Sequence, residues 1–205
     1  MALNTNIHEK FKKAFEDKCF ILMAEAYHSS INEKIIKLNM DENDISQVLF
    51  EKLDSNPKRL EFSIFATREE HLSEDIEKKK GFADKLPRVD LKMSSIISKL
   101  ELKYFFEAKN LKEKSSALKR RYIATGINNF TTKKYENGSL VGYLLEGDLN
   151  KTIQGINSLL IKKDNRSTET LISKKNHLHK DYFESEHIEI GILKHLIFDF
   201  TNISN

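Results

Sequence analysis

Three charged residues in the middle of the chain have the types and spacing to hold a divalent cation and act on a phosphate. Glu107 and Lys109 stand two positions apart in the apolar run "YFFEAKN", and residues two apart on a strand point to the same face. Asp90 begins the preceding strand-like segment, and a strand pair could bring its carboxylate beside Glu107. Two carboxylates near one point repel each other unless a cation joins them, and Mg²⁺ prefers oxygen ligands and waters. Lys109 could then orient an attacking water or stabilise charge on a phosphate.

The segments around these residues predict an α/β fold, a mixed sheet flanked by helices. Apolar residues at helical spacing indicate helices over 7–37, within 41–56 before Pro57, over the start of 111–135, and from the cap Asp148 to 163. Alternating or fully apolar runs indicate strands over 59–67, 88–97, 99–110, 139–147 and 194–200. The polar stretch 69–87 is expected to be a loop, and Gly126 is expected to interrupt its helix.

Length and composition favour one soluble domain with no membrane partner. The 205 residues can bury a sizeable core, and no apolar run approaches the length of a membrane span. The single cysteine, Cys19, is interpreted as a buried helix thiol. A reducing cytoplasm is therefore the expected location.

Basic residues are concentrated in one part of the chain. The net charge is only +3, but residues 111–180 carry 14 Lys and Arg against 6 Asp and Glu. A surface built from these residues would attract a polyanion, although a simple solvated face remains the alternative. Arg120 and Arg121 could grip phosphate oxygens through their guanidinium groups, and Lys133 and Lys134 belong to the same basic set.

The histidines carry less information. His177, His179, His187 and His195 lie near the C-terminus, but no cysteine or second regular pair accompanies them. They are expected to be surface or core residues.

The set Asp90, Glu107 and Lys109, with "RVD" followed by "FEAK", resembles the PD-(D/E)xK nuclease superfamily, whose fold is restriction-endonuclease-like. The family core has the order helix, three strands, helix, strand, which fits residues 41 to about 160. Val89 stands where the family has proline. The segment from Tyr122 to Tyr143 is similar to that of small stand-alone bacterial members grouped with restriction or anti-phage defence. The matching residues are Tyr122, Gly126, Ile127, Phe130, Tyr135, Gly142 and Tyr143.

The resemblance implies a Mg²⁺-dependent endonuclease acting on DNA, with Mn²⁺ able to substitute. Asp90 and Glu107 would bind the metal and Lys109 would assist the water. Glu42, ahead of Glu51 and Glu25, is the best match by position for the further acidic residue on the first helix of the core. Gln154 stands where the superfamily often has a Lys or Gln that lines the site, although an exposed helix glutamine is the favoured alternative. On this basis residues 1–40 form an N-terminal helical extension, 41–165 the catalytic core, and 166–205 a C-terminal strand with a flanking loop, all in a single domain.

Other interpretations stay open. The chain could be a nucleic-acid-binding or scaffolding subunit of a defence complex without turnover, and a homodimer or a protein from a defence operon could be its partner. Lys109→Ala is expected to abolish cleavage and leave folding intact.

Overall fold

The computed structural model describes residues 5–71, 88–97 and 100–203 of the protein. Its helical elements are α1 (Thr5–Asn32), α2 (Glu42–Asp54), α3 (Lys58–Glu61), α4 (Ser116–Arg121), the π-helix η2 (Tyr122–Ile127), α5 (Asn128–Thr131), α6 (Leu149–Asp164) and the 3-10 helix η3 (Ser167–Glu169). Its strands are β1 (Phe65–His71), β2 (Arg88–Ile97), β3 (Leu100–Lys112), β4 (Gly138–Glu146), β5 (Ile172–Ser173), β6 (Tyr182–His187) and β7 (Gly191–Asp199). No helix in these ranges is long and apolar enough to cross a membrane.

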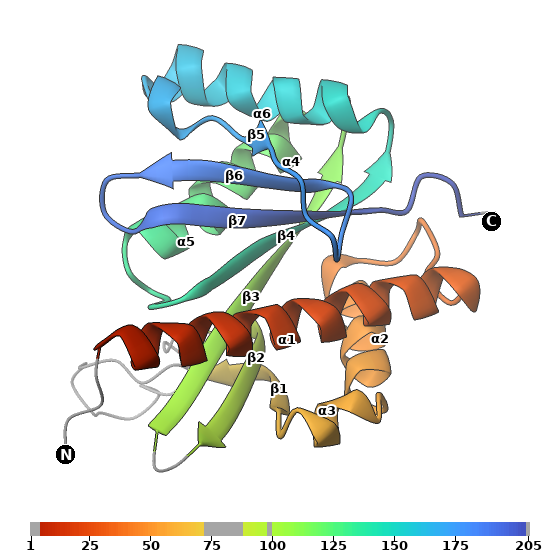
Figure 1. The fold of residues 1–205 in the computed structure, drawn as a ribbon. Helices are drawn as coiled ribbons and strands as arrows, with labels where there is room; N and C mark the ends of the chain where they lie inside the picture. The colour runs from red at the N-terminus through yellow and green to blue at the C-terminus, as the bar shows by residue number, and fades with distance from the viewer. Residues whose placement is uncertain (1–4, 72–87, 98–99, 204–205) are drawn as a thin grey trace, which may run out of the picture.

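The strands form one mixed sheet in the order β1-β2-β3-β4-β7-β6-β5. The neighbours β3, β4 and β7 run parallel, whereas the pairs at both ends of the sheet are antiparallel. Parallel strands require crossover connections, and helices supply them here. The segment from α4 to α5 joins β3 to β4, and α6 leaves the end of β4 (Figure 1). The predicted α/β class and mixed sheet are confirmed.

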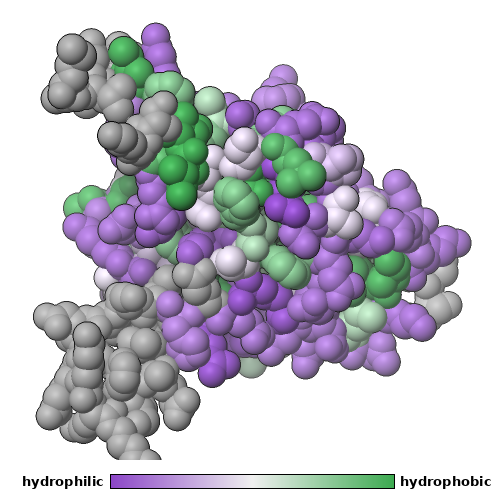
Figure 2. Space-filling model, turned by 90° about the horizontal axis from the view of Figure 1, so that it is seen from below, coloured by the Kyte–Doolittle hydropathy of each residue, from purple (hydrophilic) through white to green (hydrophobic). Residues whose placement is uncertain are grey.

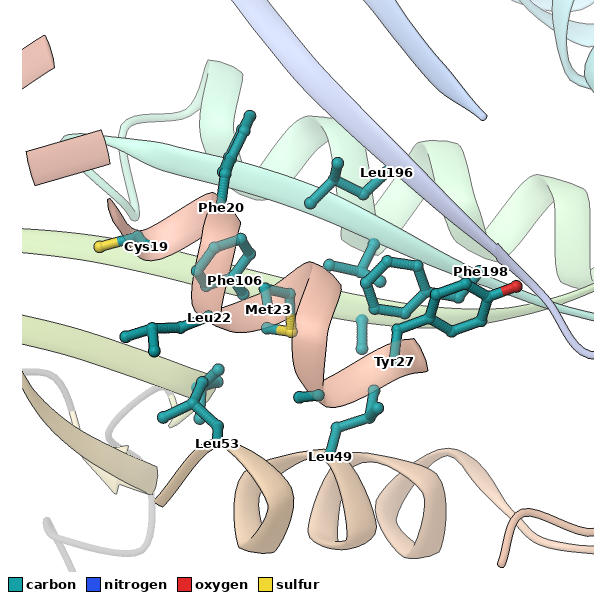
Figure 3. Packing of buried hydrophobic residues seen from close by; sticks show 14 of the residues in the cluster. Cys19, Phe20, Leu22, Met23, Tyr27, Leu49, Leu53, Phe106, Leu196 and Phe198 are labelled. Atoms are coloured by element: carbon teal, nitrogen blue, oxygen red, sulfur yellow. The ribbon is translucent and has the colours of Figure 1, made fainter. Parts of the chain in front are cut away.

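Helices cover both faces of the sheet, so the central strands are buried on each side. On one face α1 and α2 pack against β2, β3, β4 and β7. Figure 3 shows this packing, with Cys19, Phe20, Leu22, Met23 and Tyr27 of α1 beside Leu49 and Leu53 of α2 and Phe106 and Phe198 of the sheet. On the other face α4, η2, α5 and α6 enclose a second apolar cluster that includes Tyr122, Ile127, Leu140, Ile156 and Ile197. Cys19 is fully buried, as expected from the sequence.

Two features of the fold correct the sequence-based prediction. The prediction of a strand over 59–67 is wrong up to Ile64, because β1 begins only at Phe65. Pro57 instead precedes the short helix α3, and proline is well tolerated at the start of a helix. Of the alternating residues only Ile64 is fully buried, and Leu60 is 71% exposed. In 69–87, predicted as a loop, β1 extends to His71, and 72–87 lie outside the described residues.

The C-terminal region contains more sheet than predicted. The sequence indicates one strand near residues 194–200, and the structure adds β5 and β6 before it. Four of the six residues of β6 are polar, so it gives no apolar signal. The interruption expected at Gly126 is a π-helix that continues α4 into α5 without a break in the helical path.

The surface is mostly polar. Seen from below, in Figure 2, it is largely hydrophilic with small, separate hydrophobic patches. The large apolar side chains that are exposed include Leu60, Phe65 and Ile96.

Candidate functional site

The strands β2 and β3 separate at the position where Asp90 and Glu107 lie. Their last backbone pair joins Leu91 to Phe106. Beyond it β2 continues to pair with β1, whereas β3 pairs with β4 on its other side. The fork between the two strands leaves amide groups of β3 without a strand partner, and such groups need other acceptors.

Two carboxylates fill this fork. Asp90 Oδ2 accepts the backbone N–H of Ala108 at 2.7 Å, and Glu42 Oε2 accepts that of Asn110 at 2.9 Å. Glu42 is the first residue of α2, whose start is fixed by a capping box between Asp41 and Asp44. The predicted convergence of Glu42 with the β2–β3 pair therefore occurs, because the helix cap places its first turn at the end of the fork.

Lys109 lies at the centre of the cluster. Its Nζ is 2.6 Å from Glu107 Oε1, 3.5 Å from Glu42 Oε1 and 3.9 Å from Asp90 Oδ2, and it donates to the carbonyl oxygen of Ala108 at 2.6 Å. The side chains of Lys109 and Glu107 are only 5% and 6% exposed, whereas that of Asp90 is 27% exposed. Solvent reaches the cluster on the Asp90 side.

Glu107 is held by two residues from the helical layer that follows β3. Tyr135 donates its hydroxyl hydrogen to Oε2, and the Asn129 side-chain amide donates to Oε1 at 3.2 Å. Gly126 lets the π-helix η2 approach β4 closely, since a Cβ at this position would lie 2.9 Å from the Leu140 side chain. Glu107 is thereby fixed in a single orientation.

The charges in the cluster do not balance. The carboxylates of Glu42, Asp90 and Glu107 face two cations, Lys109 and Arg121, whose guanidinium donates to Glu42 Oε1 at 2.8 Å. Among the described residues, three carboxylates thus share two ion-paired cations, and Lys134 adds a weaker positive influence on Asp90 without an ion pair. Burial, together with the neighbouring Glu107, raises the pKa of the Asp90 carboxyl. Burial alone would lower the pKa of Lys109, but Glu107, Asp90 and Glu42 outweigh it and the pKa lies above its ordinary value.

The oxygens of the cluster are of the type that hard cations prefer, but they converge on the Lys109 ammonium. Four oxygens, three from carboxylates and one from the Ala108 carbonyl, surround the Lys109 ammonium, and oxygen ligands of this kind are those that Mg²⁺ and Mn²⁺ prefer. Among the described residues no three His, Cys, Asp or Glu side chains form a group that could hold a metal ion. Water molecules would thus have to complete the coordination shell of a cation held by these protein oxygens, as is common for Mg²⁺.

The residues predicted to bind nucleic acid divide into those near the cluster and those away from it. Arg121 joins the cluster, and Lys134, placed over the Tyr135 ring at 4.9 Å, lies close enough to lower the Asp90 pKa. Lys133 is exposed in the turn after α5.

Arg120 and Gln154 do not join the cluster. Arg120 makes a two-oxygen ion pair with Asp164 at 2.7 and 2.9 Å, which ties α4 to α6. Gln154 is exposed on α6, and within the described part of the chain no hydrogen bond connects it with Lys109 or the carboxylates. Arg120 is therefore already engaged in a structural contact, because its guanidinium faces a carboxylate rather than open solvent.

Two residues of the cluster have no role in the sequence-based prediction. Tyr135 belongs to the motif that carries the resemblance, but no chemistry is attached to it there, and Asn129 gives no signal at all. Their spacing from Glu107 is 28 and 22 residues, and only the path of the chain through η2 and α5 brings them back.

The C-terminal histidines are placed as expected, in the core or on the surface. His177 is exposed, and His179 is buried with its Nε2 2.7 Å from the Ile197 carbonyl oxygen. His187 and His195 belong to a buried hydrogen-bond chain. It runs from the Tyr122 hydroxyl through His195, Ser185 and His187 to Glu169.

No protein-family model matches the chain, and neither the curated proteins nor the solved structures compared with it gave a match.

Proposed function

We propose that the protein is a metal-dependent endonuclease that hydrolyses phosphodiester bonds of DNA. The single observation that carries the proposal is the convergence of Glu42, Asp90, Glu107 and Lys109 at the fork between β2 and β3. These residues come from three elements and lie up to 67 positions apart in the chain. Among the described residues, the three carboxylates share two ion-paired cations, Lys109 and Arg121, and the cluster has an exposed side at Asp90.

The order of elements supports the same proposal. The helix α2, the antiparallel strands β1, β2 and β3, the helical segment from α4 to α5, and the parallel strand β4 follow one another as in the restriction-endonuclease-like core. A role in restriction or anti-phage defence rests on the sequence resemblance alone.

The chain's own residues would act as follows. Asp90 and Glu107 would hold the cation, which when bound acidifies water and shields charge on the phosphate. Tyr135 and Asn129 keep the Glu107 carboxylate oriented. Lys109, close to the same oxygens, would donate an N–H to the attacking water or to a phosphate oxygen as negative charge develops. Water adds to phosphorus as the bond from phosphorus to one ester oxygen breaks; the attacking water would lose one proton to solvent, and the leaving oxygen would take one proton from solvent water.

One observation favours a second function, a nucleic-acid-binding or scaffolding subunit without turnover. Both oxygens of Glu107 already accept hydrogen bonds, from Lys109, Asn129 and Tyr135. In that case the cluster would only satisfy the open amides of β3. A measurement of cation binding distinguishes the two functions. A cluster whose carboxylates serve only as hydrogen-bond acceptors in the fold is not expected to bind a metal.

The test uses a control that the chain itself offers. The strand β3 contains a second Glu-x-Lys sequence, Glu101 to Lys103, whose ion pair of 3.0 Å is exposed at 54% and 44%. Plasmid, linear and single-stranded DNA would be incubated with Mg²⁺, with Mn²⁺ or with chelator. Cleavage is expected to need the metal, to disappear in Asp90→Asn and Glu107→Gln, and to survive in Glu101→Gln.

Calorimetric titration with Mn²⁺ supplies a readout independent of activity. The unaltered protein and Glu101→Gln are expected to show a site that Asp90→Asn lacks. Cleavage that persists in both Asp90→Asn and Glu107→Gln would overturn the mechanism. Absence of both cleavage and a Mn²⁺ site in the unaltered protein would support the scaffolding function.

A further inference from the structure

The loop between β5 and β6 carries a concentration of positive charge that the proposed site does not use. A hollow of about 730 Å³ opens there, lined by Ser173, Lys174, Lys175, Asn176, His177 and Lys180. No acidic side chain is among the lining residues and all three lysines are exposed, although Lys180 lies 3.8 Å from the Asp181 carboxylate beside the hollow. The hollow is therefore suited to an anion.

The loop is firmly attached to the fold. His179 is buried, with its ring edge-on to Tyr27 of α1 and Phe198 of β7. The backbone N–H of Ile197 donates to Asp181 at 2.9 Å, and that of Lys174 donates to Tyr182 at 3.1 Å. In Figure 1 the loop extends past β7 toward α1, in agreement with the His179 contact. Its lysines are thus presented from a fixed position.

Strand register places the loop at the same end of the sheet as the candidate site. Lys109 of β3 stands opposite Gly142 of β4, which stands opposite Ile197 of β7, and Ile197 is bonded to Asp181 of the loop. Three steps of about 4.8 Å each put the backbone of Asp181, the last residue of the loop, roughly 15 Å from Lys109 along the sheet. A strand of DNA that enters the fork could extend over this distance.

We propose that the hollow formed by Lys174, Lys175 and Lys180 binds the phosphate backbone of the DNA whose scissile phosphate lies at the fork. This inference rests on the proposed function and adds a second point of contact to it. Lysines that neutralise phosphates supply affinity without sequence preference and make it depend on salt. The loop would hold the DNA in position while the bond at the fork is cut.

The matched control is a second pair of adjacent lysines. Lys162 and Lys163 are exposed in the last turn of α6. Because α6 starts directly after β4 and runs back over about 24 Å, this pair lies at the opposite end of the sheet. Lys174→Ala/Lys175→Ala and Lys162→Ala/Lys163→Ala change the net charge equally, so a difference between them reports position and not total charge.

Binding would be measured by fluorescence anisotropy in chelator, so that no cleavage occurs, with a labelled duplex of about 30 base pairs and with its single strand. Salt would be varied between about 50 and 200 mM. The loop variant is expected to bind more weakly, equally for two unrelated sequences, and to lower the slope of log affinity against log salt by about two. The control variant is expected to keep the slope of the unaltered protein.

Each outcome bears on one proposal or both. Equal slopes in the loop variant and the unaltered protein, equal losses in the two variants, or no binding by the unaltered protein to either probe would overturn the proposed role of the loop. Cleavage by the unaltered protein, assayed separately with Mn²⁺, decides the nuclease function. A loop variant that loses affinity in a protein that never cleaves would keep the binding surface and refute the nuclease.

Discussion

Replacing Lys109 with methionine should strongly destabilise the protein near neutral pH. Methionine keeps the length and flexibility of the side chain but removes the ammonium that lies within 4 Å of three carboxylates. The pair with Glu107 is almost fully buried, so solvent cannot screen what is left. Removing one partner of a buried ion pair typically costs about 3–5 kcal/mol. In a chain of this size, each kcal/mol corresponds to about 2–4 °C in melting temperature, which gives a loss of roughly 6–20 °C.

The loss should shrink as the pH falls. The Asp90 pKa is already raised by burial and by Glu107, and without the ammonium it should rise further. A carboxyl whose pKa is raised in the folded state is destabilising while ionised, and protonation relieves the penalty. Melting curves of Lys109→Met and the unaltered protein should therefore approach each other between about pH 7 and pH 5. Added Mn²⁺ should stabilise the variant, because a bound cation replaces the missing charge.

The exposed pair on the same strand provides the comparison. Lys103→Met breaks the ion pair with Glu101, and exposed pairs contribute about 0–1 kcal/mol. A Lys109→Met protein within about 1 kcal/mol of the unaltered one near pH 7, or with a deficit that does not change with pH, would refute the buried charge cluster. The sequence alone predicts that Lys109→Ala leaves folding intact; the burial of the ammonium leads us to expect the opposite.

Two further predictions concern groups around the cluster and behind it. Tyr135→Phe removes the hydrogen bond to Glu107 and should cost about 1.5–3 kcal/mol of stability while lowering the cleavage rate more than the affinity for DNA, as urea unfolding and single-turnover assays can show. His195 is fully buried, and burial lowers its pKa to about 3. Its contribution to stability is present above the ordinary histidine pKa and is lost as the pH falls toward 3, by up to about 1.4 kcal/mol per pH unit. His195→Gln, which cannot titrate, should show a shallower loss in urea unfolding between about pH 7 and pH 4.

Local patterns allowed much of the fold to be predicted. The strands β2, β3 and β4 and the helices α2 and α6 have apolar periodicity or capping residues that depend only on nearby sequence. Asp90 could be placed beside Glu107 because consecutive strands usually pair. The prediction failed at α3 because this helix has only four residues and contains just one of the three alternating apolar residues, Leu60, so no helical period could be seen.

Contacts between distant segments lay beyond such patterns. The sequence singled out Glu42 only through its position in the family core. The hydrogen bond that its carboxylate accepts from the Asn110 amide depends on how α2 packs against the sheet. Tyr135 and Asn129 return to Glu107 only through the helical path from α4 through the π-helix Tyr122–Ile127 to α5. The ion pair that engages Arg120 joins residues 44 positions apart. In each case the deciding interaction is tertiary.

The two Glu-x-Lys sequences of β3 show what distinguishes a candidate site from an ordinary surface pair. Glu101 and Lys103 have the same spacing and charges as Glu107 and Lys109, and in each pair the lysine forms an ion pair with the glutamate. The first pair lies where β3 is still matched to β2, with Ile96 opposite Glu101 and Ser94 opposite Lys103, and both its side chains extend into solvent.

The second pair lies beyond the last β2–β3 pair, where the open amides of β3 draw in the carboxylates of Asp90 and Glu42. An ammonium with one carboxylate is a neutral pair, whereas an ammonium among three carboxylates attracts further positive charge even with Arg121 beside it. We therefore propose that the fork in the sheet, more than the Glu-x-Lys spacing, would favour a cation, and a variant that closed the fork would be expected to make the second pair as inert as the first.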